Sequence, residues 1–554
     1  MDTQLTEYLK EYLSNNDIDG LLLNTTNDYM VEYNTQDLNS VYYTTDFTGS
    51  TGFVLLTKDK TFLFVDTRYH EQADNQVNAE FIEVVKVPLG KPFISVISET
   101  IPAYFKLGIV GKKISKQFYE KLEKNLIAKN STIRIFATDA VIEYKKDLIK
   151  NRDYNVFSVP VEITKYTADE KFETLKSYID GNFKVIVTAL EDIAYLTNLR
   201  SYSFDYSAIF PAKAIITQDG VNIYTNCDLP HIGKYFKVLP AENFEKDLFA
   251  TKNEELFIDE AQLSIYDFNL INSNNKLQQS HLKLLKTVKN ENEIEHLKKC
   301  FERADKALEV IYEMLESDKV YSEYEYYQAL VKSMKDNGAK SLSFKPIVAS
   351  GENSSIIHYS TPSKEKMVNE GDFLLIDYGG YYEGGYATDT TRTFVKGEPS
   401  EQQKLAYTTV LRAYLNANFS KYGKKSTYLD IDKNARTTIE KGISEEYKFA
   451  HATGHGVGIG VHENPPVVSS TDLSKSKILE NTVFSIEPGV YKEGWGGIRL
   501  ENTVYASIVN NELEIIPLSK APFEIKLVDL SLLSDVEKYY YMKCMKGQAE
   551  SCIH

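Results

Sequence analysis

Nine histidines occur in the chain, and four of them fall between residues 358 and 462, a region that also contains many carboxylates. These four are His358, His451, His455 and His462. Imidazole and carboxylate groups are the side chains that most often bind divalent cations or move protons in catalysis. Taken singly, each has an ordinary structural explanation as a turn residue or a packed, hydrogen-bonded histidine. Their arrangement along the chain, however, indicates a shared chemical site.

The segment 373–395 contains two strand-like runs on either side of a Gly-Gly turn signal, a pattern that predicts a β-hairpin. If the hairpin turns around Glu383, Asp377 and Asp389 are cross-strand partners, since both are equally far from that residue. Partners on one face lie about 4.5–5.5 Å apart, and like charges so placed destabilise a sheet. A cation between the two aspartates would remove this cost, so the pair is a candidate metal site.

A second predicted hairpin, residues 482–506, repeats this arrangement. Glu487 and Glu501 are symmetric about Gly494, and the glycine-rich loop around Gly494 can close the hairpin. His455 lies between the two hairpins in the sequence and is flanked by glycines, which allow close approach of backbone or substrate. The two hairpins and this histidine therefore predict five metal ligands.

Four ionised carboxylates and one neutral imidazole carry four negative charges, which two divalent cations cancel. Room is then left for a bridging hydroxide, and two-metal sites of this kind hold their ions about 3.5–4 Å apart and activate water for hydrolysis. A ligand set made mostly of oxygen favours hard or borderline ions such as Mn, Co, Fe or Zn. The residue types thus indicate hydrolysis by metal-activated water.

The part of the chain that carries these residues begins with a predicted amphipathic helix. Its apolar residues recur at spacings of three and four, which marks one helical face. They are Ile294, Leu297, Phe301, Ala304, Leu308, Ile311 and Leu315. From Ser343 onward the sequence changes to short strand-like runs with many glycines, and all the candidate site residues lie in this part of the chain.

The first half of the chain reads as two similarly built α/β regions. A buried strand at 21–24 and a hairpin at 54–67, turning at 58–60, have counterparts in the order of apolar and polar residues at 185–192 and 214–226. The polar segment 145–171 between them has little periodicity and is predicted to be a linker. An old duplication explains the repeat, although two unrelated α/β domains with similar strand patterns remain an alternative.

Length and composition limit the function classes. A chain of 554 residues suggests about three domains. Its net charge of −16 and lack of a basic stripe disfavour nucleic acid and anionic membranes as partners. No apolar run is long enough to span a membrane, and the N-terminal residues lack the features of a secretory signal. Because the four cysteines, Cys227, Cys300, Cys544 and Cys552, form neither a disulfide framework nor a metal motif, we expect a reducing cytoplasm.

The segments that carry the five ligands resemble the metallopeptidase family with the pita-bread fold, which includes methionine aminopeptidase, proline dipeptidase and aminopeptidase P. The matching motifs are LLIDYGG, TDTTRT, TGHGVG, SIEPG and IRLEN, and they supply Asp377, Asp389, His455, Glu487 and Glu501 in order. The motifs IVASGENSSIIHY and VHENPP add His358 and His462. One departure is a spacing of twelve residues between the two aspartates, where eleven is usual in the family.

The remaining segments resemble the three-domain aminopeptidase P subfamily over nearly the whole chain. This resemblance implies an α/β (α+β) architecture with two creatinase-like N-terminal α/β domains followed by a C-terminal pita-bread metallopeptidase domain. We expect these domains at 1–155, 160–286 and 287–554, the last with a short C-terminal extension. The segments that carry the resemblance are FTGSTGFVLL, FVDTRYHEQA, VTALEDIAYLTNLRSYSFDYSAIFPAKAII and PFEIKLVDLSLLSDVEKYYY.

The resemblance implies hydrolysis of the bond between an N-terminal residue and a penultimate proline. Glu487 is then the general base, His462 stabilises the oxyanion, and His358 binds or shuttles protons near the leaving proline. His451 is expected to contact the substrate backbone. Residues expected at the proline pocket are Val461, Tyr491 and Arg499, although Tyr491 could equally be a core residue.

The expected cofactors are two divalent ions per subunit, Mn first and Co or Zn as alternatives. The expected partners are peptides that begin with Xaa-Pro and a second copy of the chain in a cytoplasmic homodimer. Two alternatives remain open at this point. One is a proline dipeptidase restricted to two-residue substrates, and the other is a non-catalytic scaffold of the same fold.

Overall fold

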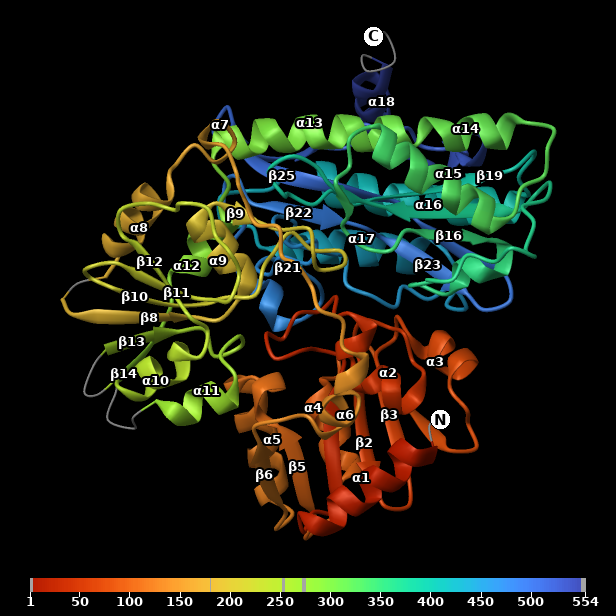
Figure 1. Cartoon of the computed structure of the whole chain (residues 1–554). Helices are drawn as coiled ribbons and strands as arrows, with labels where there is room; N and C mark the ends of the chain where they lie inside the picture. The colour runs from red at the N-terminus through yellow and green to blue at the C-terminus, as the bar shows by residue number, and fades with distance from the viewer. Residues whose placement is uncertain (1–2, 180, 252–254, 272–275, 550–554) are drawn as a thin grey trace. The chain divides into compact units, whose positions relative to one another are not determined.

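The computed structural model describes residues 3–179, 181–251, 255–271 and 276–549, and the chain divides into two compact units (Figure 1). The first unit comprises residues 1–158, 166–205 and 209–283, and the second comprises 159–165, 206–208 and 284–554. All the predicted site residues belong to the second unit. The three domain boundaries expected from the sequence stay predictions.

The first unit begins with a six-stranded sheet in the order β4-β3-β2-β1-β5-β6. Its strands are β1 (Gly20–Asn24), β2 (Phe53–Thr57), β3 (Thr61–Val65), β4 (Ile82–Lys86), β5 (Lys106–Val110) and β6 (Thr132–Phe136). The accompanying helices are α1 (Thr3–Asn15), α2 (Ser40–Thr45), α3 (His70–Gln76), α4 (Phe93–Thr100), α5 (Lys116–Ile127) and α6 (Ala140–Tyr144). The hairpin β2–β3 turns at residues 58–60, as predicted.

A second six-stranded sheet in the same unit has the order β12-β11-β10-β8-β13-β14. Its strands are β8 (Phe183–Val187), β10 (Lys213–Thr217), β11 (Val221–Tyr224), β12 (Phe236–Leu239), β13 (Glu255–Ile258) and β14 (Lys276–Gln279). The helices are α8 (Ala168–Lys176), α9 (Leu190–Thr197), α10 (Asn243–Phe249) and α11 (Ile265–Leu270). Strand for strand, both the order and the parallel or antiparallel sense repeat those of the first sheet, which confirms the predicted similarity of the two regions.

The second unit is built on an antiparallel sheet in the order β16-β17-β19-β25-β22, with β26 added on β25. Its strands are β16 (Ile347–Ser350), β17 (Phe373–Tyr378), β19 (Thr390–Val395), β22 (Val483–Ile486), β25 (Glu501–Val509) and β26 (Glu512–Pro517). Four short two-residue strands lie outside this sheet, β15 (Ser341–Leu342), β18 (Gly380–Tyr381), β20 (Gly454–His455) and β21 (Val467–Val468). The pair β23 (Gly489–Lys492) and β24 (Gly496–Arg499) forms a separate hairpin.

Helices cover this sheet in two groups, each with its own apolar core. The first group is α13 (Glu291–Ala307), α14 (Glu309–Glu316) and α15 (Glu323–Asp336), with α13 and α14 running end to end in Figure 1. It packs on residues of β16, β17 and β19. The second group is α16 (Glu401–Phe419), α17 (Tyr428–Gly442) and α18 (Asp535–Ala549), and it packs around β22 to β26. The apolar side chains of the sheet are packed in these two cores. This packing fixes the positions of the polar residues on the same strands.

The helix predicted over residues 294–315 is present but is divided in two at Leu308. Its predicted apolar face is buried, with Leu297, Phe301 and Ile311 fully inaccessible. The segment 145–171, predicted to be a linker, is more ordered than expected. It contains β7 (Phe157–Ser158), α7 (Val161–Thr164) and the start of α8, because Thr167 and Glu170 form a capping box.

Three cysteines, Cys227, Cys300 and Cys544, are free thiols, and Cys552 lies outside the described residues. Within the described part of the chain, no helix combines the length and the apolar character needed to cross a membrane. The mixture of two α/β sheets with an antiparallel, helix-covered sheet confirms the predicted α/β (α+β) class.

Candidate metal centre

Three adjacent strands of the central sheet in the second unit place polar residues side by side. Asp377 in β17 is paired with Thr391 in β19, and Thr391 is in turn paired with Glu501 in β25. Cross-strand neighbours in adjacent strands share a face. Two of the predicted ligands therefore lie on one surface, with a threonine between them.

The predicted pairing of Asp377 with Asp389 is wrong, because Asp377 lies opposite Thr391. The pairs of this hairpin are centred on Gly384, one residue later than predicted, and Gly384 and Gly385 both adopt positive φ angles, of 87° and 65°. Two glycines can close the turn at that point at little conformational cost. Asp389 precedes Thr391 by two residues, so the period of two still brings it to the face of Asp377.

The second predicted hairpin has the expected register. Pairs in β22–β25 and in β23–β24, such as Ile486 with Asn502 and Gly489 with Arg499, are all symmetric about Gly494. Glu487 and Glu501 are therefore at opposed positions just where the two strand pairs meet. This confirms the predicted geometry of the second carboxylate pair.

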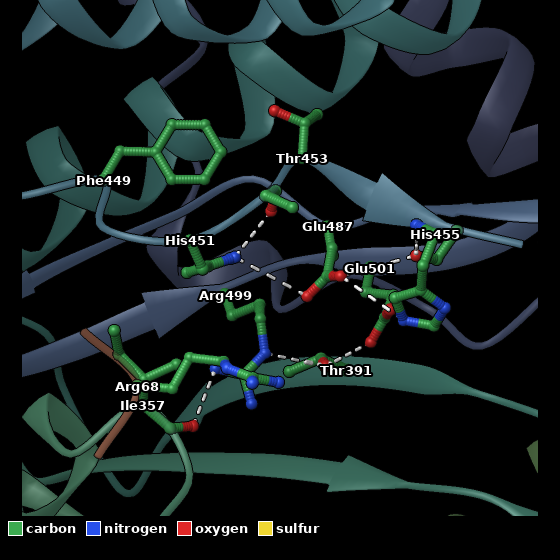
Figure 2. Close-up of polar contacts among 12 residues, drawn as sticks. Arg68, Ile357, Thr391, Phe449, His451, Thr453, His455, Glu487, Arg499 and Glu501 are labelled. Atoms are coloured by element: carbon green, nitrogen blue, oxygen red, sulfur yellow. Dashed lines mark hydrogen bonds and ion pairs between the residues drawn. The ribbon is translucent and has the colours of Figure 1, made fainter. Parts of the chain in front are cut away.

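His455 completes a tight group with these carboxylates (Figure 2). Possible ligand atoms of Asp389, His455 and Glu501 lie within 4.8 Å of one another. His455 Nε2 is 3.5 Å from Asp389 Oδ2 and 3.5 Å from Glu487 Oε1. Its other ring nitrogen, Nδ1, is 3.1 Å from the Gly456 carbonyl oxygen, a contact that fixes the ring orientation and presents Nε2 to the carboxylates.

Asp377 is attached to the group through Arg499. The guanidinium donates to Asp377 Oδ2 at 2.7 Å and to Thr391 Oγ1 at 3.1 Å. Thr391 Oγ1 in turn donates to Glu501 Oε2 at 2.6 Å. Among the described residues, Asp377 Oδ1 is a buried oxygen with no hydrogen-bond partner, which is costly unless a cation or donor satisfies it.

The electrostatics of the group favour a bound cation. Burial raises the pKa of Asp389 and of Glu501 well above the usual carboxyl range, and the charges of neighbouring carboxylates raise both further. Burial also raises the pKa of Asp377, although Arg499 opposes this effect. Divalent ions would offset the repulsion and satisfy the unpaired oxygen. A donor set of four carboxylates and one imidazole suits hard or borderline ions, so the residues present fit a two-metal centre.

His451 and Tyr491 form a chain that ends at the same arginine. His451 Nε2 is 2.9 Å from the Tyr491 hydroxyl, which accepts a 2.7 Å hydrogen bond from Arg499 Nη1. Nδ1 of His451 is 3.7 Å from Glu487 Oε2. Burial raises the pKa of Tyr491 to about 12, so its hydroxyl stays protonated at neutral pH. The sequence left open whether Tyr491 faces substrate or core, and its buried ring and these polar contacts give it a supporting position at the edge of the group.

The other predicted site residues lie on two loops. The His462 ring packs edge-on against His455, with the ring centroids 4.4 Å apart. Val461, beside it, is buried. His358 is half-buried and follows Ile357, whose carbonyl oxygen accepts a hydrogen bond from Arg499 at 3.4 Å. The loop that carries His358 therefore reaches the arginine that binds Asp377.

Sequence reasoning missed three residues that support the ligands. Thr391 binds Glu501, and the Ser485 hydroxyl accepts from the His455 amide at 3.1 Å and donates to Glu487 Oε1 at 3.4 Å. Arg392 is fully buried and donates to the Glu501 carbonyl oxygen. All three stand in predicted ligand motifs, Thr391 and Arg392 in TDTTRT and Ser485 in SIEPG, and alternation along a strand could have placed Ser485 on the face of Glu487.

Substitution of Thr391 by valine is expected to weaken metal binding about ten- to hundredfold, because outer hydrogen bonds to ligands have effects of that size. Loss of the hydroxyl removes the hydrogen bond to Glu501 Oε2 and one hydrogen-bond acceptor of Arg499. Isothermal titration of the metal-depleted variant with Mn²⁺ measures the change.

The adjacent Thr390→Val is the matched control. Thr390 is fully buried in the same strand, and among the described residues its hydroxyl has no hydrogen-bond partner. Equal losses of affinity in the two variants would mean that Thr391 acts through packing of the strand and not through Glu501.

Three family models match successive segments of the chain. Residues 295–507 match the model of metallopeptidase family M24, and residues 6–143 and 149–293 each match a creatinase/prolidase N-terminal domain. A probable Xaa-Pro aminopeptidase P of Coprinopsis cinerea is 28% identical over 96% of this chain and 92% of its own length. Xaa-Pro aminopeptidase 1 of Dictyostelium discoideum is 27% identical over 96% and 90%.

Among solved structures, X-prolyl aminopeptidase of Caenorhabditis elegans, a cytosolic enzyme with a di-nuclear active site, superposes with a TM-score of 0.87. It shares 22% sequence identity and covers 96% of this chain and 92% of its own. At that identity the likeness establishes the fold alone, across nearly the whole chain.

Proposed function

Because residues 295–507 match the model of metallopeptidase family M24 and the preceding segments match two creatinase/prolidase N-terminal domains, we propose that the protein is a metal-dependent aminopeptidase specific for Xaa-Pro bonds. It removes the N-terminal residue from peptides whose second residue is proline. The observation that carries the proposal is the convergence of Asp389, His455, Glu487 and Glu501, with Asp377 held beside them by Arg499. The full-length relatives named as Xaa-Pro aminopeptidases support the substrate class.

The five converging side chains would hold two divalent ions. When bound, these ions supply Lewis-acid activation of water and of the scissile carbonyl. We favour Mn²⁺ because oxygen donors dominate the set, with Co²⁺ or Zn²⁺ as alternatives. A cytoplasmic homodimer is the assembly we propose.

Glu487 is the proposed general base. One of its oxygens accepts from Ser485 and the other lies 3.7 Å from His451, so the carboxylate has a fixed orientation. It takes a proton from the attacking water and delivers it to the prolyl nitrogen. Proton delivery is essential there because the prolyl amide is tertiary and has no N–H of its own.

The histidines outside the ligand set have complementary roles. A ring N–H of His462 donates to the carbonyl oxygen as that oxygen gains charge. His358 holds a proton near the leaving prolyl nitrogen, and His451 contacts the substrate backbone. Val461 and Tyr491 contribute to the proline pocket, and Arg499 lies beneath it, where its charge opposes the rise that burial causes in the pKa of Asp377.

The proposal is tested by incubating the Mn²⁺-reconstituted protein with Xaa-Pro-Yaa and matched Xaa-Ala-Yaa peptides. Release of the first residue from the proline peptides only is the expected result. No cleavage of either series by protein that retains two ions would favour the non-catalytic scaffold. The presence of all five predicted ligand residues argues against that alternative.

The protein is expected to cleave Xaa-Pro-Yaa and longer peptides at least as efficiently as Xaa-Pro dipeptides. A dipeptidase needs a cation to capture the carboxylate that follows proline, since burying it unpaired would be costly. The two arginines of the catalytic motifs already have buried acceptors. Arg499 binds Asp377 and Tyr491, and Arg392 binds the Ala521 and Glu501 carbonyl oxygens.

The measurement is kcat/KM for a dipeptide, a tripeptide and a nonapeptide that share one N-terminal residue. A dipeptide preference above about tenfold corresponds to about 1.4 kcal/mol of transition-state binding. Such a preference would instead identify a proline dipeptidase with additional domains.

A further inference from the structure

Glu323 is the first residue of helix α15 and carries a buried carboxylate that lies outside the candidate metal centre. Its side chain is fully inaccessible to solvent. Within the described part of the chain, no lysine or arginine forms an ion pair with it. An ionised group in such a position is costly unless hydrogen bonds satisfy its oxygens.

Four donors satisfy the Glu323 carboxylate, and all four belong to the segment 350–363, which we call the His358 loop. They are the Ser350 amide (2.6 Å) and Asn353 Nδ2 (3.0 Å) on Oε1, and the Tyr359 hydroxyl (2.8 Å) and the Ser363 amide (3.0 Å) on Oε2. A carboxylate has about four acceptor positions, so this one is saturated. Burial and the Glu323 charge raise the pKa of Tyr359, which keeps its hydroxyl a donor.

The donors lie at the two ends and in the middle of the His358 loop, so one side chain fixes the whole segment. The backbone of α15 adds to the same attachment, because the Tyr324 amide donates to the Ser363 carbonyl oxygen at 3.0 Å. The positive end of the helix dipole and hydrogen bonds to a charged acceptor both stabilise an anion at this position. The loop is therefore anchored to a rigid helix.

From this anchor the His358 loop reaches the metal centre. The Ser354 hydroxyl accepts from the Gly497 amide in β24 at 2.8 Å, and the Ile357 carbonyl oxygen accepts from Arg499 at the end of the same strand. Gly496 is so close to the loop that an added Cβ would lie 2.7 Å from the Gly351 carbonyl oxygen. The side that carries His358 is thus pressed against the strand that ends at Arg499.

We propose that Glu323 is a positioning residue for the reaction, which acts by holding the His358 loop so that His358 meets the leaving prolyl nitrogen. The inference rests on the proposed function for its kinetic consequence. Among the described residues, the Glu323 carboxylate is hydrogen-bonded to the His358 loop and to none of the proposed metal ligands. It keeps His358 at the position that proton transfer requires. A displacement of about 1 Å can lower the rate of the catalysed reaction about a hundredfold.

Glu323→Gln tests the proposal because it keeps the shape of the side chain and removes one acceptor edge. Whichever way the amide turns, its NH₂ group faces either the Ser350 amide or the Ser363 amide, and neither N–H can rotate away. Glu325→Gln is the matched control. Glu325 lies two residues later in the same helix, and its carboxylate accepts from Ser322 and, among the described residues, has no hydrogen bond to the His358 loop.

For Glu323→Gln, we expect kcat on an Xaa-Pro-Yaa peptide to fall about ten- to hundredfold, with KM changed less than threefold and metal content unchanged. Glu325→Gln should stay within twofold of the parent enzyme. In a His358→Ala background, Glu323→Gln should cause less than a further twofold loss, because both changes act on the same step. A further tenfold loss in that background would overturn the proposal in favour of a general structural role.

Hydrogen exchange gives a readout that does not depend on activity. Peptides covering residues 350–363 should exchange faster in Glu323→Gln, while those covering α16 and α17 should be unchanged. If the parent protein cleaves no Xaa-Pro peptide, the proposed function fails, and the exchange result still decides whether Glu323 anchors the loop. Unchanged exchange in the loop would overturn the anchoring itself.

Tyr359→Phe provides a second variant if Glu323→Gln fails to fold. It removes one donor from Glu323 and leaves the other three in place. We expect a smaller fall in kcat, about three- to tenfold, with faster exchange limited to residues 350–363. Parent-like kcat together with parent-like exchange would overturn the proposal.

Discussion

Removal of the divalent ions from this protein is expected to abolish hydrolysis of Xaa-Pro peptides, and Mn²⁺ is expected to restore it at least as well as Zn²⁺. Without ions, neither the water nor the scissile carbonyl is activated, and the Asp389 and Glu501 carboxylates repel each other in a buried site. The preference for Mn²⁺ follows from four carboxylates against one imidazole. The experiment is exhaustive chelation, elemental analysis, and titration of kcat/KM with each metal.

Asp389→Asn is a useful companion to chelation, because it removes one charge from the cluster and keeps the size of the side chain. Its activity should stay low at Mn²⁺ concentrations that saturate the parent protein. Full turnover by protein in which elemental analysis finds no metal would refute a two-metal mechanism. Better restoration by Zn²⁺ than by Mn²⁺ would refute only the assignment of the metal.

His462→Ala is expected to lower kcat about 10²–10³-fold, the size seen when one donor to a developing oxyanion is lost. The bound metal should remain at the parent level, because His455 keeps its own contacts to Gly456 and Ser485. The loop should also stay in place. Glu463, the residue after His462, is buried in an ion pair with Lys289, and its carboxylate accepts a hydrogen bond from the Ile459 amide at 2.9 Å.

His231→Ala, at an exposed histidine of the first unit, is the control and should leave turnover unchanged. Both variants are compared by kcat, KM and metal content on one Xaa-Pro-Yaa peptide. Loss of metal together with activity in His462→Ala would show that His462 is a ligand or holds one. The role of an oxyanion donor would then be wrong.

Much of the metal centre could be predicted because its residues stand in strands, where side chains alternate with a period of two. The symmetry of Glu487 and Glu501 about Gly494 is a property of the sequence, and the structure confirms it. The same argument failed by one residue for Asp377, since it centred the turn on Glu383 and the structure centres it on Gly384, the first of two glycines with positive φ angles. Local spacing does not distinguish between two turn centres that are one residue apart.

The elements that hold the site were predictable to different degrees. The repeated sheet of the first unit follows from the order of apolar runs and turn residues, and its hairpins are local structures. The break of the long helix at Leu308 was not foreseen, because the apolar face continues through it. The capping box that starts α8 was overlooked within a segment of otherwise weak periodicity.

The sequence alone predicted which groups do the chemistry, namely four carboxylates and a histidine in ordered motifs, and its composition disfavours a nucleic-acid or anionic-membrane partner. Only the tertiary structure decided what holds these groups. Arg499 links Asp377 to Tyr491, Thr391 binds Glu501, and Glu323 anchors the His358 loop from a separate helix. Hydrogen bonds between residues tens to more than a hundred positions apart depend on how the strands and helices pack, and spacing along the chain carries no record of them.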